Sequence, residues 1–399
     1  MKLAFKMQSS PRAPKADMLS YIGKKWSRQY TINMGILQRI GSWIRPFVHI
    51  PATGLDISDR AIKYLKLGAG DPFSVDAYGE LEIPEGAISE GDIKNADAVS
   101  AILSSWYRRE KHTLKTRFVS ASLPEQKGFV RLVQLSKVKP EEIRDAIRFE
   151  IEGTIPLPLE ETLYDYEVIE PLQDHLDHID LAVTAFPKTV INSYVGAIKN
   201  AGLKPYALEL ESHALLRACA FGRERASALV IDIGRTRTNL VIHSAGAAIF
   251  TSTIPFGGQL MEDALTKTLG ITPDEACDLK VRVGLDRKER GGTIFSALVP
   301  SIAALADEAQ RAIEYYQNHA LHAHGADPFI NRIVLAGGDA NLNGLDTYLA
   351  AVLRVRVLRQ DPFASFRTRM TQAVPPLSRH ESLAFTHAFG LALKSYGYL

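Results

Sequence analysis

Two short segments, 176 positions apart, place an aspartate at the same point of the same pattern. Residues 54–63 read GLDISDRAIK and residues 230–239 read VIDIGRTRTN. In each segment an apolar strand runs to an aspartate, Asp56 or Asp232, and a short polar turn leads into a second apolar strand. Backbone N–H groups in such turns can approach phosphate oxygens, and each carboxylate can hold a hydrated divalent cation. The pair therefore predicts two hairpins around a triphosphate, one from each half of the chain.

A third segment completes this pattern. Residues 333–340 read IVLAGGDA, a strand followed by paired glycines whose bare backbone could lie flat against a base or ribose. In this order the three segments resemble the phosphate 1, phosphate 2 and adenosine motifs of the actin, heat-shock-protein-70 and sugar-kinase superfamily. The resemblance implies an α/β, actin-like (ribonuclease H-like) two-domain fold that binds ATP with Mg²⁺. The implied nucleotide-binding residues are Asp56, Ser58, Asp232, Gly234, Thr236, Thr238, Gly257, Gly258, Lys280, Gly337 and Gly338, with Asp56 and Asp232 holding Mg²⁺ through water.

Composition places the chain among globular proteins. Its 399 residues are 46% hydrophobic and 23% charged, enough for two domains with separate cores. Cys219 and Cys277 are the only cysteines, which favours a reducing cytoplasm over a disulfide framework. The sequence contains no apolar run near the roughly 20 residues of a membrane span, and its N-terminus lacks a signal-peptide pattern. We therefore expect a cytoplasmic protein.

Charge is concentrated at the N-terminus. Residues 1–46 contain nine basic residues and one acidic residue, a net charge of +8, so the rest of the chain carries −6. Ile36, Leu37, Ile40 and Ile44 recur at helical spacing within this basic arm. One interpretation is a membrane-surface segment that contacts anionic lipid. The other is a disordered tail with one helix packed on the body. Residues after 46 give no nucleic-acid signal.

An α+β module interrupts the first half. Residues 129–135 alternate as a strand, and the helix predicted over 140–152 has Ile143, Ile147 and Ile151 on one face. A proline turn at 155–158, strands at 163–170 and 179–186, and a helix at 188–201 follow. The predicted domains are the arm 1–46, a first subdomain of 47–122 with 202–226 and 380–399, the inserted subdomain 123–201, and a second half of 227–379.

This inserted subdomain narrows the resemblance to the type IV pilus assembly PilM family and its relative, the FtsA division proteins. The matching segments are residues 141–150 (EEIRDAIRFE), 155–161 (IPLPLEE), 164–166 (YDY), 201–205 (AGLKP), 254–258 (IPFGG), 275–280 (EACDLK) and 388–393 (AFGLAL). The resemblance implies a cytoplasmic scaffold that is peripheral to the inner membrane and can self-associate. It would receive the N-terminal tail of the inner-membrane protein PilN in a groove between the first and inserted subdomains. An FtsA-like division protein tethered to the membrane is the alternative.

Departures from the family pattern concern the nucleotide. Ser58 and Asp59 stand where a glycine and a small hydroxyl residue are usual, and both changes oppose close approach of an anion. Asp339 stands in a loop that is commonly all glycine and alanine, and Cys277 replaces a glutamate expected three residues before Lys280. Lys280 could reach the nucleotide or be a surface lysine. The sequence identifies no catalytic residue, so we expect nucleotide binding with weak or absent hydrolysis; a vestigial pocket is the alternative.

Overall fold

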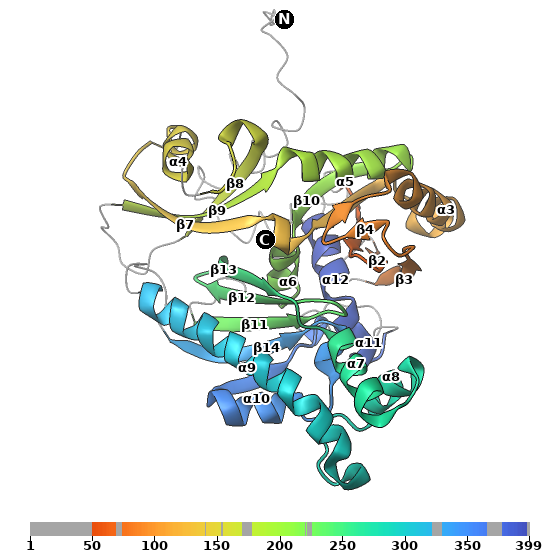
Figure 1. Ribbon diagram of the computed structural model, residues 1–399. Helices are drawn as coiled ribbons and strands as arrows, with labels where there is room; N and C mark the ends of the chain where they lie inside the picture. Colours follow the sequence, from red (N-terminus) through yellow and green to blue (C-terminus); the bar gives the residue numbers. More distant parts are fainter. Residues whose placement is uncertain are drawn as a thin grey trace, which may run out of the picture. The chain divides into compact units, whose positions relative to one another are not determined.

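The computed structural model describes residues 50–68, 74–139, 141–152, 155–169, 178–219, 221, 226–320, 329–364 and 377–396. Contacts divide the chain into two units, Met1–His49 and Ile50–Leu399. The predicted basic arm, 1–46, therefore lies outside the described residues. In the second unit, two five-stranded sheets and a three-stranded sheet are covered by helices (Figure 1).

The first five-stranded sheet has the order β10-β6-β1-β2-β3. Its strands are β1 (Thr53–Ile57), β2 (Ala61–Leu67), β3 (Val75–Glu82), β6 (Phe118–Leu123) and β10 (Lys204–Leu210). Strand β1 pairs antiparallel with β2 and parallel with β6. In β3 exposed acidic residues alternate with inward-facing ones, of which Val75 and Leu81 are buried.

The second five-stranded sheet repeats this topology in the order β13-β12-β11-β14-β15. Its strands are β11 (Ser227–Ile233), β12 (Thr238–Ser244), β13 (Ala247–Ile254), β14 (Ile330–Ala336) and β15 (Arg356–Arg359). Strand β11 pairs antiparallel with β12 and parallel with β14, as β1 does with β2 and β6. Asp56 and Asp232 consequently occupy equivalent places in the two halves.

Helices complete the two halves. Helices α3 (Ala96–Leu114) and α5 (Lys188–Asn200) pack in the first core, and α7 (Gly258–Leu269), α8 (Pro273–Arg282), α9 (Thr293–Ala320) and α10 (Leu345–Leu353) cover the second sheet. Local signals explain their starts, since Asn95 caps α3 and Thr272 forms a capping box before Pro273 at α8. Helix α6 (Glu211–Cys219) comes after β10 in the chain, and α11 (Arg379–Ala384) and α12 (Thr386–Lys394) come after β15. As predicted, the last helix returns to the first half, where it contacts β1 and α6.

The inserted module is an antiparallel sheet of order β7-β9-β8 with one helix on it. It comprises β7 (Phe129–Ser136), α4 (Ile143–Ile151), β8 (Thr162–Ile169) and β9 (His178–Pro187). The predicted isoleucine face of α4 packs against Val133, Leu181 and Val183 of the sheet. The helix predicted over 188–201 is present as α5. Its Val190, Tyr194 and Ile198 lie in the first core, so its packing groups it with α3 rather than with the module.

The remaining elements are short. A two-stranded ribbon joins β4 (Ile88–Ser89) and β5 (Asp92–Ile93), and four single turns are η1 (Glu125–Lys127), η2 (Leu159–Glu161), η3 (Glu289–Gly292) and η4 (Gly338–Asn341). Among the described helices, none combines the length and the apolar character needed to cross a membrane.

Candidate functional site

Helix α12 fits closely against both β1 and α6. A Cβ added at Gly54 of β1 would lie 2.0 Å from the Ala388 carbonyl oxygen, and one at Gly390 would lie 1.9 Å from the Ala214 carbonyl oxygen of α6. Any side chain at these two positions would therefore push the helix away. The glycines fix α12 beside the end of β1. This placement brings His387, in the first turn of α12, between the two predicted aspartates.

His387 lies between the carboxylates of the two halves. Its Nε2 is 3.3 Å from Asp232 Oδ2, and its Nδ1 is 3.8 Å from Asp56 Oδ2. The side chain is 10% exposed, and the contacts are ion-pair approaches rather than aligned hydrogen bonds. Burial by itself lowers the pKa of His387, but the carboxylates of Asp232 and Asp56 outweigh it and raise this pKa to about 10. The ring is therefore an imidazolium at neutral pH.

Further polar groups surround this triad. The Asn239 amide donates to Glu211 Oε2 at 2.8 Å and approaches Asp232 Oδ2 at 3.5 Å. The Asp56 carboxylate accepts from the Ser122 hydroxyl at 3.2 Å. Burial raises the pKa of Glu211, although the Arg237 guanidinium and His387 act against that rise. The network thus neutralises most of the negative charge that the fold brings together.

A second bridge joins the two turns themselves. Arg237, in the turn after β11, donates from its Nη1 to Asp59 Oδ2 at 3.1 Å in the turn after β1. The Gly91 N–H donates to the other oxygen of Asp59 at 3.0 Å, and the Arg237 Nη2 approaches Glu211 Oε1 at 3.8 Å. Burial lowers the pKa of Arg237, but Glu211 and Asp59 raise it overall. The sequence suggested that the negative charge of Asp59 would oppose the approach of an anion; in the fold this carboxylate is paired with Arg237.

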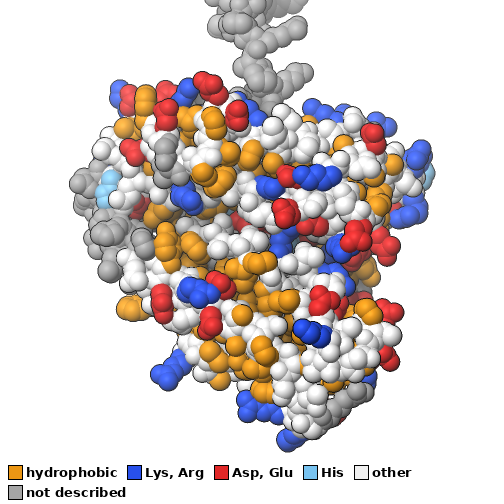
Figure 2. Space-filling model, in the orientation of Figure 1, with side chains coloured by type: hydrophobic (Ala, Val, Ile, Leu, Met, Phe, Trp, Pro, Cys, Tyr) orange, Lys and Arg blue, Asp and Glu red, His pale blue; other side chains and the backbone are white. Residues whose placement is uncertain are grey.

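A third cluster lies within the second half. Lys280 is buried, and its Nζ donates to Glu262 Oε1 at 2.7 Å and to the Asp339 carboxylate. The Asp339 carboxylate packs on Gly258, where an added Cβ would lie 2.2 Å from one of its oxygens. Burial lowers the pKa of Lys280, but Asp339 and Glu262 raise it overall. The alternative of a surface lysine is therefore wrong. Acidic and basic side chains also lie close together along the boundary between the halves (Figure 2).

The other predicted residues shape the loops. The Ser58 hydroxyl donates to the Ala61 carbonyl at 2.8 Å within its own turn, and the Thr238 hydroxyl donates to the Phe256 carbonyl at 2.8 Å. Thr236 is exposed. The Gly234 carbonyl accepts from the Gly258 N–H at 3.0 Å, which joins the second turn to the start of α7. A Cβ added at Gly257 would lie 2.5 Å from the Arg235 carbonyl oxygen, so this loop needs glycine.

The two glycines after β14 differ from each other. Gly337 has φ of +84°, and a Cβ there would lie 2.3 Å from the Ile233 carbonyl oxygen. A Cβ on Gly338 would meet only Ala384, at 3.5 Å. The adenosine-type loop therefore keeps one face of Gly338 open, the feature that the sequence prediction needs for a base or ribose.

The residues around the predicted metal position fit a divalent ion poorly. Mg²⁺ prefers oxygen ligands in near-octahedral geometry and usually retains several waters. Here the imidazole of His387 stands beside both carboxylates. Among the described residues, no group of three or more histidine, cysteine, aspartate and glutamate side chains could hold a metal ion. The Mg²⁺ site at Asp56 and Asp232 stays an untested prediction.

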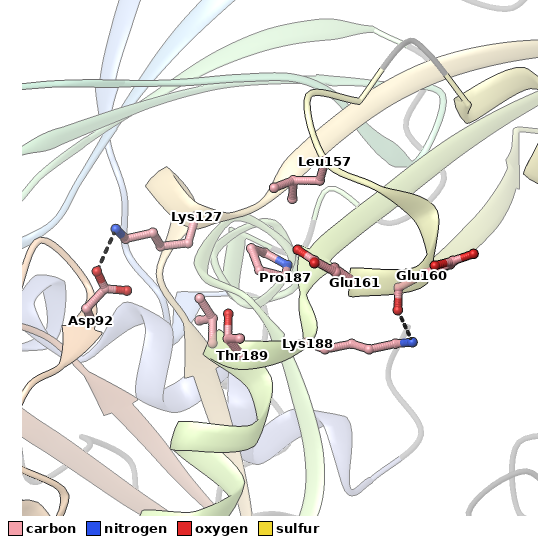
Figure 3. A pocket seen from close by; sticks show the side chains of 9 residues that line it. Asp92, Lys127, Leu157, Glu160, Glu161, Pro187, Lys188 and Thr189 are labelled. Carbon is pink, nitrogen blue, oxygen red and sulfur yellow. Dashed lines mark hydrogen bonds and ion pairs between the residues drawn. The ribbon is translucent and has the colours of Figure 1, made fainter.

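A groove lies between the first half and the inserted module. Its volume is about 550 Å³. Its lining residues come from β5, η1, the loop before β8, and the junction of β9 with α5 (Figure 3): Asp92, Lys127, Leu157, Glu160, Glu161, Pro187, Lys188, Thr189 and Val190. Lys127 pairs with Asp92 at 3.0 Å, and Lys188 donates to the Glu160 carbonyl. Burial acts to raise the pKa of Asp92, but hydrogen bonds from Lys127 and Lys94 lower it overall. The groove thus combines apolar side chains, Leu157, Pro187 and Val190, with charged ones.

Sequence reasoning missed several members of the cleft network. They are His387, Arg237, Glu211 and Asn239. Glu262, which pairs with Lys280 within the second half, was missed as well. Arg237 and Asn239 fall inside the recognised second motif, but their partners are distant in sequence. His387 offered one signal, a single histidine in the otherwise apolar segment 383–393 that reads LAFTHAFGLAL. A polar residue on a buried face calls for a partner.

Comparison with known proteins agrees with this architecture. A family model described as type IV pilus assembly protein PilM matches residues 54–396. A solved structure described as the PilM-PilN type IV pilus biogenesis complex is 23% identical, with a TM-score of 0.69 over 87% of this chain and 99% of that one. MreB5 of Spiroplasma citri bound to ADP is 15% identical, with a TM-score of 0.50 over 85% of this chain and 94% of that one. The actin-like fold with its inserted module is confirmed.

Proposed function

Because the chain belongs to the type IV pilus assembly protein PilM family, we propose that it is a pilus-assembly scaffold that receives the N-terminal cytoplasmic tail of a PilN-like inner-membrane protein. In this proposal the scaffold is cytoplasmic and peripheral to the inner membrane. The groove between the first half and the inserted module is the binding site. ATP binds in the cleft between the halves and is hydrolysed weakly or not at all.

The groove carries the proposal. Its volume of about 550 Å³ accommodates a few side chains of an extended peptide rather than a folded domain. Leu157 and Val190 supply apolar contacts, and the charged walls can orient the peptide. An interface of this size depends on one or two anchors, so a single lining substitution has a large effect. The related solved complex, described as PilM with PilN, supports this choice of partner.

Peptide binding tests the groove. A synthetic N-terminal tail of the neighbouring pilus membrane protein should bind the full chain, and Leu157→Glu should weaken binding at least about tenfold by adding a charge at an apolar anchor. Val352→Glu, on an exposed position of α10, is the matched control and should bind like the wild type. Equal affinity for all three proteins in calorimetry, or no binding at all, would contradict the proposal.

Nucleotide binding is supported by the loops that converge on the cleft. We expect ATP at a hundredfold excess over its dissociation constant to stabilise the fold by roughly 2.7 kcal/mol. Gly338→Leu should remove this effect by covering the open face of that loop. Gly196→Leu is the control, because a Cβ at Gly196 on α5 meets nothing within 4 Å. Thermal melts that show no ATP effect in the wild type would contradict the nucleotide part alone.

Turnover is proposed to be weak because Asp56, Asp59 and Asp232 already have cationic partners in the cleft. Phosphate release in the presence of Mg²⁺ should not exceed that of Asp232→Ala protein. Rapid release by the wild type would favour an ATPase whose cycle drives assembly.

Attachment of the arm to anionic lipid is a separate part of the proposal. Each basic residue near such a surface contributes about 1 kcal/mol, and the attraction weakens with salt. Protein lacking residues 1–46 should therefore stay in the supernatant under conditions in which the full chain sediments with phosphatidylserine vesicles. Equal sedimentation of the two proteins would support the tail interpretation instead.

A further inference from the structure

The cleft between the two halves contains cationic side chains at the places where acidic groups of both halves meet. His387 approaches Asp232 at 3.3 Å and Asp56 at 3.8 Å, and Arg237 approaches Asp59 at 3.1 Å. We propose that His387 takes the place of a divalent cation between Asp56 and Asp232, and that with the Arg237–Asp59 pair it joins the two halves without metal or nucleotide.

The first argument is the position of the ring. The two ring nitrogens face different carboxylates, one at the end of β1 and one at the end of β11. Because α12 belongs to the first half, the contact with Asp232 crosses to the second half, and the contact with Asp56 holds the ring at the end of β1. With one partner in each half, the ring makes the same bridge that a cation between two carboxylates makes, and it does so as part of the chain.

The second argument is that the ring cannot easily withdraw. Helix α12 is held at van der Waals distance from β1 and α6 by Gly54 and Gly390. His387 is in its first turn, and its side chain is 10% exposed. A hydrated cation at the same place would have to displace a packed side chain. It would also leave the imidazole buried without its acidic partners, which is costly.

The third argument is electrostatic. Two buried carboxylates from different halves repel each other in a low dielectric unless a positive charge lies between them. Glu211 adds a third acidic group next to Asp232, linked to it through the Asn239 amide. His387 and Arg237 are the cationic side chains that the described residues bring to these acids. The same two side chains therefore determine whether the halves attract or repel each other.

This inference does not depend on the proposed peptide or nucleotide binding. It concerns the free protein, so a failure of either ligand to bind leaves it untouched. Conversely, a bridge made by metal would overturn it while leaving the groove proposal intact.

A comparison of variants in the full chain tests the bridge. His387→Gln should lower the Tm of the free protein by roughly 5 to 10 °C, because it leaves two buried carboxylates without their cation. The same substitution in an Asp56→Asn, Asp232→Asn background should change the Tm little, since the charges are then absent. His243→Gln is the control. That histidine is also buried, but it lies away from the cleft, where its ring stacks on Phe221 with 4.6 Å between the ring centroids. Its effect should be the same in both backgrounds.

Metal provides the second measurement. Millimolar Mg²⁺ should leave the Tm of the wild type unchanged, and likewise that of the Asp56→Asn, Asp232→Asn variant that retains His387. It should raise the Tm of His387→Ala, which has both carboxylates and no cation between them. Equal effects of His387→Gln in the two backgrounds would overturn the proposal, as would a wild type whose Tm rises with Mg²⁺ as much as that of His387→Ala. If the single histidine variants do not fold, the triple variant with both asparagines must fold, and its failure would likewise overturn the bridge.

Discussion

The groove and the cleft both lie between structural units of this protein, yet their charges are arranged oppositely. In the groove, Lys127 pairs with Asp92 on one wall, while Leu157 stands across a cavity of about 550 Å³. In the cleft, by contrast, Arg237 reaches Asp59 and His387 reaches Asp232, each in the opposite half. Charges that pair along one wall leave space for a partner. Charges that pair across an interface close it.

The two regions are connected through Glu125. This residue begins η1, whose Lys127 lines the groove, and its carboxylate accepts from the Ser212 N–H at 3.0 Å at the start of α6. Glu211, the residue directly before Ser212, belongs to the cleft network. A change in the cleft therefore has a short covalent and hydrogen-bonded route to the groove wall, which is the physical basis on which nucleotide binding could alter peptide affinity.

The largest stability effect is expected at the cluster within the second half. Lys280→Met should lower the free energy of unfolding by about 3 to 5 kcal/mol, because it leaves Glu262 and Asp339 buried without their cation. Lys267→Met, on the exposed side of α7, is the control and should be nearly neutral. Urea unfolding measures both. A cost below 1 kcal/mol for Lys280→Met would mean that these acids are not charged in the folded protein.

A smaller loss is expected from the bridge between the turns. Arg237→Met should cost about 2 to 3 kcal/mol, because Asp59 and Glu211 lose a partner that is 14% exposed. Adding Asp59→Asn should recover part of the loss. Calorimetry with the tail peptide should be run beside the unfolding curves of Arg237→Met. If this substitution lowered the peptide affinity as strongly as it lowered the stability, the distinction between groove and cleft would be contradicted.

The connection at Glu125 predicts a pH-dependent gain. Burial raises the pKa of Glu125 to about 7, with the Ser212 N–H acting against that rise. The folded state therefore holds this proton more tightly than the unfolded chain does. The resulting stability is complete below pH about 4.5 and is lost as pH rises through 7. Glu125→Gln mimics the neutral form and should add about 2 kcal/mol at pH 8 and little at pH 4. Denaturant curves at the two pH values check this, and an equal effect at both would contradict it.

The smallest effect is expected at the groove wall. Asp92 and Lys127 are partly exposed, with side chains 36% and 26% accessible, so solvent screens their pair. Asp92→Asn should change the free energy of unfolding by less than about 1 kcal/mol. It should nevertheless change the salt dependence of tail binding, because Lys127 is then free to interact with the peptide. An affinity with the same salt dependence as the wild type would place the peptide elsewhere.

Local sequence signals predicted much of the fold and of the loops. The repeated strand–Asp–turn–strand pattern located β1, β2, β11 and β12, and the isoleucine spacing located α4. These signals work because hydrophobic period and turn chemistry act over a few residues. The same signals say less at β3, where acidic side chains alternate with buried ones, and at α5, whose apolar face lies in the first core. A buried face shows that a helix packs, but not on what.

The sequence by itself determined the family, the doubled scaffold and the positions of Asp56, Asp232 and the glycine turns, since each depends on residues close together in the chain. Only the tertiary structure decided what those groups contact. Asp59 meets Arg237 178 positions away, and His387 meets Asp56 and Asp232 from the far end of the chain. Electrostatic pairing depends on distance in space and on burial. For that reason a carboxylate that reads as a metal ligand in the sequence lies beside a histidine in the fold.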